Sequence, residues 1–103
     1  MPRPYGQKFL YALSKTELDM LGIELAKVCV KANLPATYVA AALETTRTTI
    51  FNWFRGQGIR ESKRKTVENF IEMVNRDLQD NILPAKTYLE ARKYIENIIG
   101  VSI

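Results

Sequence analysis

Apolar residues recur at steps of three and four along most of this chain, which is the period of an amphipathic helix. No segment alternates apolar and polar residues convincingly with the period of two that a half-buried strand requires, so the pattern predicts no sheet. Helices are expected near residues 14–32, 35–44, 47–55, 66–80 and 84–99. The predicted fold class is therefore all-α, a compact bundle of about five helices.

Each expected helix has one apolar face that can pack into a shared core. The members of these faces are Leu18, Leu21, Leu25, Val28 and Ala32; Val39, Ala40 and Leu43; Ile50, Trp53 and Phe54; Val67, Phe70, Ile71, Val74 and Leu78; and Tyr88, Ala91, Ile95 and Ile98.

Local signals indicate where several of these helices begin and end. Ser14 and Glu17 have the spacing of a capping box at the start of the first helix. Thr46 is expected to cap the third helix, because a threonine hydroxyl accepts a hydrogen bond from the first turn. Gly56 and Gly100 are expected to end the third and fifth helices in the left-handed conformation.

The chain divides into three parts by composition. Residues 1–13 begin with two prolines and a glycine and are predicted to form an N-terminal arm, whose apolar residues from Phe9 to Leu13 pack on the first helix. Residues 14–83 are expected to form the main domain. Residues 84–103 are predicted to form a C-terminal helix, opened by Pro84, and a possible dimerisation element of the same domain.

Composition excludes several classes of function. The 103-residue chain has a net charge of +4, no histidine and one cysteine, Cys29, which is expected in the core. Neither a Cys/His zinc site, nor an internal disulfide, nor a histidine-dependent nucleophile can form, so we expect no enzyme activity and no cofactor. No signal peptide or membrane span is apparent, and the cytoplasm of a bacterial or phage-infected cell is the expected location.

The segment from Leu34 to Gln57 resembles the phage repressor and Cro-like (XRE-type) helix-turn-helix family of DNA-binding proteins. Apolar anchors, a small alanine, a threonine cap and a terminal Arg-Gly pair occupy the family's positions: Val39, Ala40, Leu43, Thr46, Ile50, Trp53, Arg55 and Gly56. The sequence departs from the pattern at Glu44, which stands where the turn usually has glycine. It departs also at Thr45, usually apolar, and at Ala36, which is often a glutamine.

The resemblance implies that the third helix is a recognition helix that enters the major groove of DNA. Arg47 is then placed to bind guanine and Asn52 to read adenine, whereas Phe51 faces either thymine methyl groups or the N-terminal arm. Cations in a polar loop over residues 57–65 are expected to contact phosphate. The implied DNA-binding residues are Thr46, Arg47, Thr48, Thr49, Phe51, Asn52, Arg55, Arg60, Lys63, Arg64 and Lys65.

The predicted function is sequence-specific binding of double-stranded DNA, in a transcriptional regulator. The alternatives are a small DNA-packaging protein, similar to a terminase small subunit, and a helical protein–protein adaptor that does not bind DNA. Residues 88–103 carry more apolar surface than one helical stripe needs. This excess predicts a homodimer, although a tail packed on its own domain explains the same residues. No small-molecule substrate or membrane partner is expected.

Overall fold

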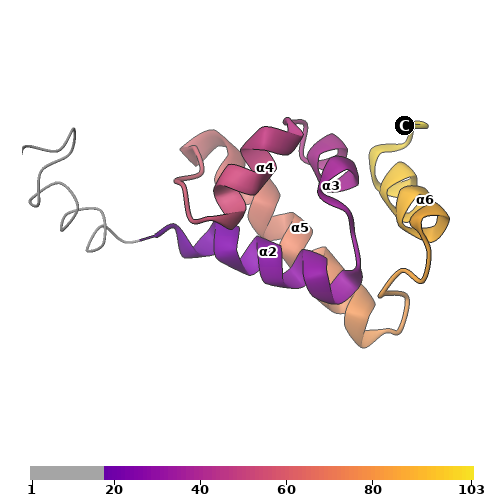
Figure 1. Cartoon of the computed structure of the whole chain (residues 1–103). Coiled ribbons are helices and arrows are strands. Elements are labelled where there is room, and N and C mark those ends of the chain that lie inside the picture. The colour runs from indigo at the N-terminus through magenta and orange to yellow at the C-terminus, as the bar shows by residue number, and fades with distance from the viewer. Residues whose placement is uncertain (1–17) are drawn as a thin grey trace, which may run out of the picture.

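The structure is a computed structural model that describes residues 18–103. Its helices are α2 (Met20–Ala32), α3 (Ala36–Ala42), α4 (Arg47–Phe54), α5 (Glu61–Gln79) and α6 (Tyr88–Ile99) (Figure 1). No strand occurs between residues 18 and 103, so the predicted all-α class is confirmed over the described part of the chain. None of these helices is both long enough and apolar enough to cross a lipid bilayer.

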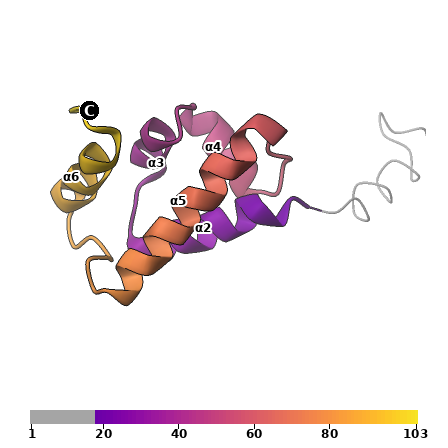
Figure 2. The same ribbon diagram turned by 180° about the vertical axis from the view of Figure 1, so that it is seen from behind.

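The helices pack in a chain of neighbours. The long helix α5 lies along α2, and α4 packs on α2 from another side (Figures 1 and 2). Helix α3 packs between α4 and α6, so α6 lies at the far end of the molecule, beside α3. Every helix contributes to one core, whose largest fully buried side chains are Leu25, Val39, Leu43, Ile50, Val67, Val74 and Ile95.

Most of the expected core positions are buried, four are half-buried and two are exposed. Leu18 is 54% exposed because it precedes the helix on which it was expected, and Tyr88 is 72% exposed. Cys29 is buried as expected, and burial raises the pKa of its thiol to about 12. A thiol with so high a pKa is unreactive, which agrees with a packing role.

Helix α2 starts later than predicted. It begins at Met20, because Asp19 takes an extended conformation and its carboxylate accepts a hydrogen bond from the Leu21 backbone at 3.2 Å. Asp19 is therefore the N-cap of this helix, and the predicted start at residue 14 is wrong. The capping box expected at Ser14 and Glu17 lies outside the described residues.

Two more helix starts differ from the prediction. Helix α5 begins at Glu61 rather than at residue 66, so Lys63, Arg64 and Lys65 are helical and not in a loop. The charged first turns carry no apolar stripe, although lysine, arginine and glutamate are good helix formers. Helix α6 begins at Tyr88 rather than at Pro84.

The start of α6 follows from contacts of the segment before it. The backbone N–H of Ala85 donates to the Ala32 carbonyl at 2.9 Å, and the Asn33 side chain donates to the Ala85 carbonyl at 2.7 Å. These bonds hold the chain at the end of α2. Thr87 then caps the new helix by accepting from the Glu90 backbone at 3.1 Å.

The predicted cap of α4 and the glycines after α4 and α6 are confirmed, whereas α3 ends at Ala42, two residues before the predicted end. Thr46 caps α4, and Gly56 and Gly100 follow α4 and α6 with φ of 97° and 79°. Glu44, which stands where the repressor-like turn usually has glycine, adopts φ 54°. This left-handed conformation is less favourable for a residue with a Cβ atom, so the turn after α3 contains local strain.

Gly22 allows α4 to approach α2 closely. A Cβ atom at this position would lie 2.1 Å from the Trp53 carbonyl oxygen and 2.8 Å from its carbon. Any side chain at residue 22 would therefore collide with the backbone of α4. The position of α4 on the molecule depends on this glycine.

Candidate nucleic-acid interface

Helices α3 and α4 form a compact pair joined by the four residues Leu43–Thr46. The turn is closed by the Thr45 backbone N–H, which donates to the Ala40 carbonyl at 2.9 Å. Val39 and Ala40 of α3 and Ile50 of α4 are buried in the core. The pair is thus attached to the rest of the protein through its apolar side and through the contact of α3 with α6, whereas the opposite face of α4 is open to solvent.

The exposed side of α4 begins at its N-cap. Thr46 Oγ1 accepts from the Thr49 backbone at 3.1 Å and donates to Thr49 Oγ1 at 2.9 Å. Both hydroxyls therefore take part in the cap. Thr48 is exposed and takes no part in these two hydrogen bonds. The partial positive charge of the helix N-terminus favours an anion near this end.

Arg47 and Phe51 form a contact one turn apart on this face. The Arg47 guanidinium lies 5.4 Å from the centre of the Phe51 ring, a cation–π distance. Phe51 also meets Phe54 edge-on, with ring centres 6.0 Å apart. The ring of Phe51 therefore supports Arg47 at the exposed surface of α4. Asn52 is half-buried beside this face.

The charge around α4 is of one sign. Between Glu44 and Glu61 the chain contains three arginines and no acidic residue. Arg47, Arg55 and Arg60 are all exposed, and none of them forms an ion pair within residues 18–103. Lys65 is exposed as well. These four cations are accessible to a polyanion.

Lys63 makes structural contacts in addition to carrying charge. Its ammonium group donates to the carbonyls of Leu43 at 2.6 Å and Glu44 at 3.3 Å. These carbonyls lie at the C-terminal end of α3, where a cation is favourable. Lys63 therefore ties α5 to the turn that joins α3 and α4.

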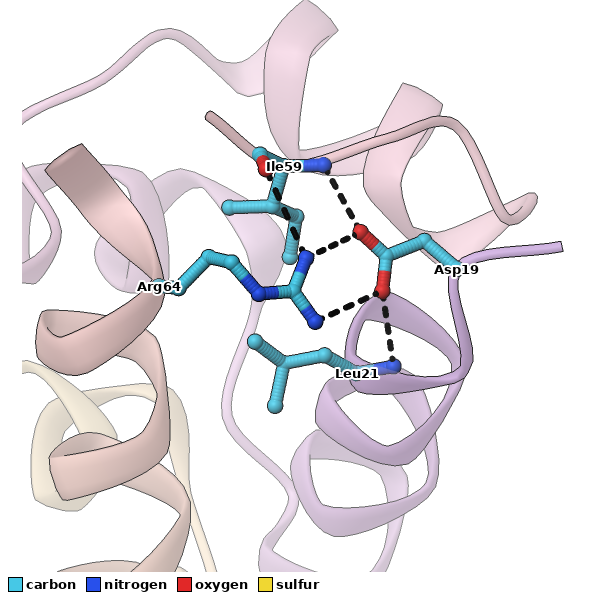
Figure 3. Close-up of polar contacts among 4 residues, drawn as sticks. All are labelled: Asp19, Leu21, Ile59 and Arg64. Atoms are coloured by element: carbon cyan, nitrogen blue, oxygen red, sulfur yellow. Dashed lines mark hydrogen bonds and ion pairs between the residues drawn. The ribbon is translucent and has the colours of Figure 1, made fainter. Parts of the chain in front are cut away.

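Arg64 forms an ion pair with Asp19 instead of pointing freely into solvent (Figure 3). Its Nη1 lies 2.6 Å from Asp19 Oδ2 and its Nη2 lies 3.3 Å from Oδ1. The same carboxylate accepts from the Ile59 backbone at 2.8 Å, and it caps α2 through Leu21. One side chain therefore joins the start of α2, the segment after α4 and the first turns of α5.

The electrostatics of this cluster favour the ionised carboxylate. The Arg64 hydrogen bond is the largest contribution, and backbone donors add to it, so the pKa of Asp19 falls below its ordinary value of 3.8. Asp19 was expected inside the first helix, and its role as a cap and ion-pair partner was not predicted. An aspartate before an apolar helical run is a typical N-cap, and this signal identifies it.

A cleft of about 530 Å³ opens beside α4. Its walls are the C-terminal end of α2, the N-terminal end of α3, Phe51 and Phe54 of α4, and Lys86–Tyr88. No acidic residue of the described chain lines it. Phe51 thus lies both under Arg47 and at the rim of an aromatic cleft.

Comparison with known protein families, curated proteins and solved structures finds no match to this chain. In the part of the chain from Leu18 onward, no group of three or more histidine, cysteine, aspartate or glutamate residues is placed to hold a metal ion.

Proposed function

We propose that this protein binds double-stranded DNA in a sequence-specific manner through the exposed face of α4, as a transcriptional regulator. The observation that carries the proposal is the surface of α4 and its flanks, which presents Arg47, Arg55 and Arg60 without an intervening acid. DNA binding needs cations that neutralise phosphate and side chains that reach base edges. Both kinds of group occur here, on a short helix fixed by a buried opposite side.

The exposed cations have different proposed roles. Arg47, at the first position of α4, makes paired hydrogen bonds with a guanine, and Phe51 limits the conformations of its side chain. Arg55, Arg60 and Lys65 contact phosphates. Thr48 and Asn52 meet base edges or the sugar–phosphate backbone.

Lys63 and Arg64 are assigned a positioning role in this proposal, although the sequence suggested phosphate contacts for them. Lys63 holds the turn before α4, and Arg64 holds Asp19 and the segment after α4. Both ends of the proposed recognition helix are then fixed from α5. Their removal is expected to change stability first and DNA affinity second.

Fluorescence anisotropy with labelled DNA tests the proposal. Sites selected from a random pool give the specific duplex, and a scrambled duplex gives the reference. Arg47→Ala should weaken specific binding by about 1–3 kcal/mol, roughly 5–150-fold, and bind the scrambled duplex almost as before. Arg76→Ala, which removes an exposed arginine in the last turn of α5, is the matched control and should leave both affinities close to those of the wild type.

Two outcomes would contradict the proposal. Failure of the random pool to yield any enriched site would remove sequence specificity. Binding without salt dependence, or equal losses for Arg47→Ala and Arg76→Ala, would mean that α4 is not the DNA-contacting face.

We also propose that the protein binds DNA as a homodimer. A single recognition helix reads few base pairs, and two helices about 34 Å apart enter successive major grooves. Leu89 and Val101 are 59% and 63% exposed on α6 and the segment after it. These apolar side chains support a two-fold contact through residues 88–103.

A further inference from the structure

Exposed apolar side chains gather at the cleft beside α4. Val30, Phe51 and Tyr88 all line it, and they are 80%, 36% and 72% exposed. Single exposed hydrophobic residues are ordinary, but several on one concave surface indicate a site that another group covers. Covering these side chains would remove apolar surface from water at the base of the proposed recognition helix.

The chain itself contains a suitable group. Residues 9–13 are Phe-Leu-Tyr-Ala-Leu, an uncharged run of five apolar residues outside the described part. The described chain starts at Leu18, and Asp19 fixes its beginning by donating its backbone N–H to the Gly56 carbonyl at 2.9 Å. Gly56 follows α4 directly, two residues after Phe54 of the cleft wall.

The length of the connecting chain allows the contact. Residues 14–17 join Leu13 to Leu18, and this linker with its end residues spans up to about 17 Å when extended. Val30, at the far side of the cleft, lies ten residues along α2 from Met20, a rise of about 15 Å. A short tether gives an effective concentration in the millimolar range, so modest apolar contacts are sufficient for docking.

We propose that residues 9–13 occupy the cleft of their own chain. The segment covers Val30 and Tyr88 and the exposed edges of Phe51 and Phe54, and it braces α4 against the end of α2. This inference does not depend on DNA binding, because it rests on the cleft, its exposed apolar residues and the bond that holds Asp19 at Gly56.

Paramagnetic relaxation in the full chain tests the contact without DNA. Cys29 is the only cysteine, so Cys29→Ala combined with Ala12→Cys gives a single attachment point for a nitroxide label. Strong signal loss is expected at Val30, Phe51 and Tyr88 relative to the reduced label. Ile82, which is exposed to 61% and does not line the cleft, is the site of the control variant.

A second variant tests whether binding in the cleft causes the loss of signal. Val30→Glu changes an exposed side chain and leaves the core intact, and it should restore the signals of Phe51 and Tyr88. Ile82→Glu should not restore them. Full signal at the cleft in the labelled chain, or unchanged loss in Val30→Glu, would overturn the proposal.

A mixing experiment distinguishes docking within one chain from docking between two copies of the chain. Labelled chain without isotope is mixed with isotope-enriched chain without label. Loss at the cleft only in this mixture would assign the site to residues 9–13 of a second copy and would overturn docking within one chain. Loss only when label and isotope share a chain is the expected result.

Discussion

Replacing Gly22 by alanine tests the close contact between α2 and α4. The added Cβ would lie 2.1 Å from the Trp53 carbonyl oxygen, whereas ordinary contact starts at 3.4 Å. No rotamer change relieves a clash with backbone, so α4 has to shift away from α2 by about 1 Å or more. Such overpacking costs about 1–3 kcal/mol, occasionally more.

Alanine also brings a gain that opposes this cost. It is a better helix former than glycine by about 1 kcal/mol. Because the clash is with a backbone that is itself fixed by packing, we expect the cost to be larger than usual and the net loss to be about 2 kcal/mol. At about 4–8 °C per kcal/mol for a domain of this size, the Tm should fall by roughly 8–16 °C.

Trp53 fluorescence during thermal unfolding measures the change in Tm with a probe at the contact between α2 and α4. Trp53 is the only tryptophan, it belongs to α4, and it is 6% exposed. Gly58→Ala is the matched control, because no atom lies within 4 Å of an added Cβ there. The control should change stability by less than about 1 kcal/mol, in the stabilising direction. A Gly22→Ala protein that melts at or above the wild-type temperature would refute the close approach of α4 to α2.

Further predictions concern the core, the Asp19 cluster, α5 and the assembly. Trp53→Ala should destabilise the protein by about 3–5 kcal/mol, and an unchanged melting curve by circular dichroism would mean that this side chain is not in the core. Asp19→Asn keeps a cap for α2 but removes the charge that pairs with Arg64, so its urea midpoint should be lower at pH 7. Folding lowers the pKa of Asp19 below 3.8, so the stabilisation is present above about pH 4 and is lost as the pH falls through the lower folded value. The two midpoints should therefore converge in acid, and a constant gap would contradict the ion pair. Lys65→Met should reduce the salt slope of DNA binding by about one unit, whereas Lys63→Met should mainly lower the Tm, since Lys63 caps α3. In sedimentation with DNA the full chain should be a dimer, and Leu89→Asp with Val101→Asp should reduce it to a monomer. A wild-type monomer at high micromolar concentration would exclude the dimer, and a closed ring would favour the DNA-packaging alternative.

The number and type of helices follow from the sequence because they depend on spacing. The period of three to four apolar positions defines the buried face of each helix wherever it sits, and Ile50, Trp53 and Ile95 are buried as that spacing predicts. The caps of α4 are equally local. Thr46 bonds three residues ahead, and Gly56 supplies a left-handed conformation without help from distant residues.

The candidate site could be predicted only in part. The one-sided exposure of Arg47 and Phe51 follows from the helical phase set by Ile50 and Trp53. The sequence does not show which cations are free and which bind other parts of the protein, because Lys63 and Arg64 are basic residues next to a third one, Lys65. Their carbonyl and carboxylate partners lie roughly 20 and 45 residues away, and no local pattern encodes such a pairing.

Tertiary structure also decided where α2 begins and how closely α4 packs on it. Asp19 is an effective cap here because its carboxylate is shared with Ile59 and Arg64, which reach it from another part of the chain. Gly22 looks like a weak point of a helix in the sequence, where glycine is unfavourable. In the structure the backbone of α4 at Trp53 lies so close to Gly22 that no side chain fits there. This requirement exists only when α2 and α4 are packed together.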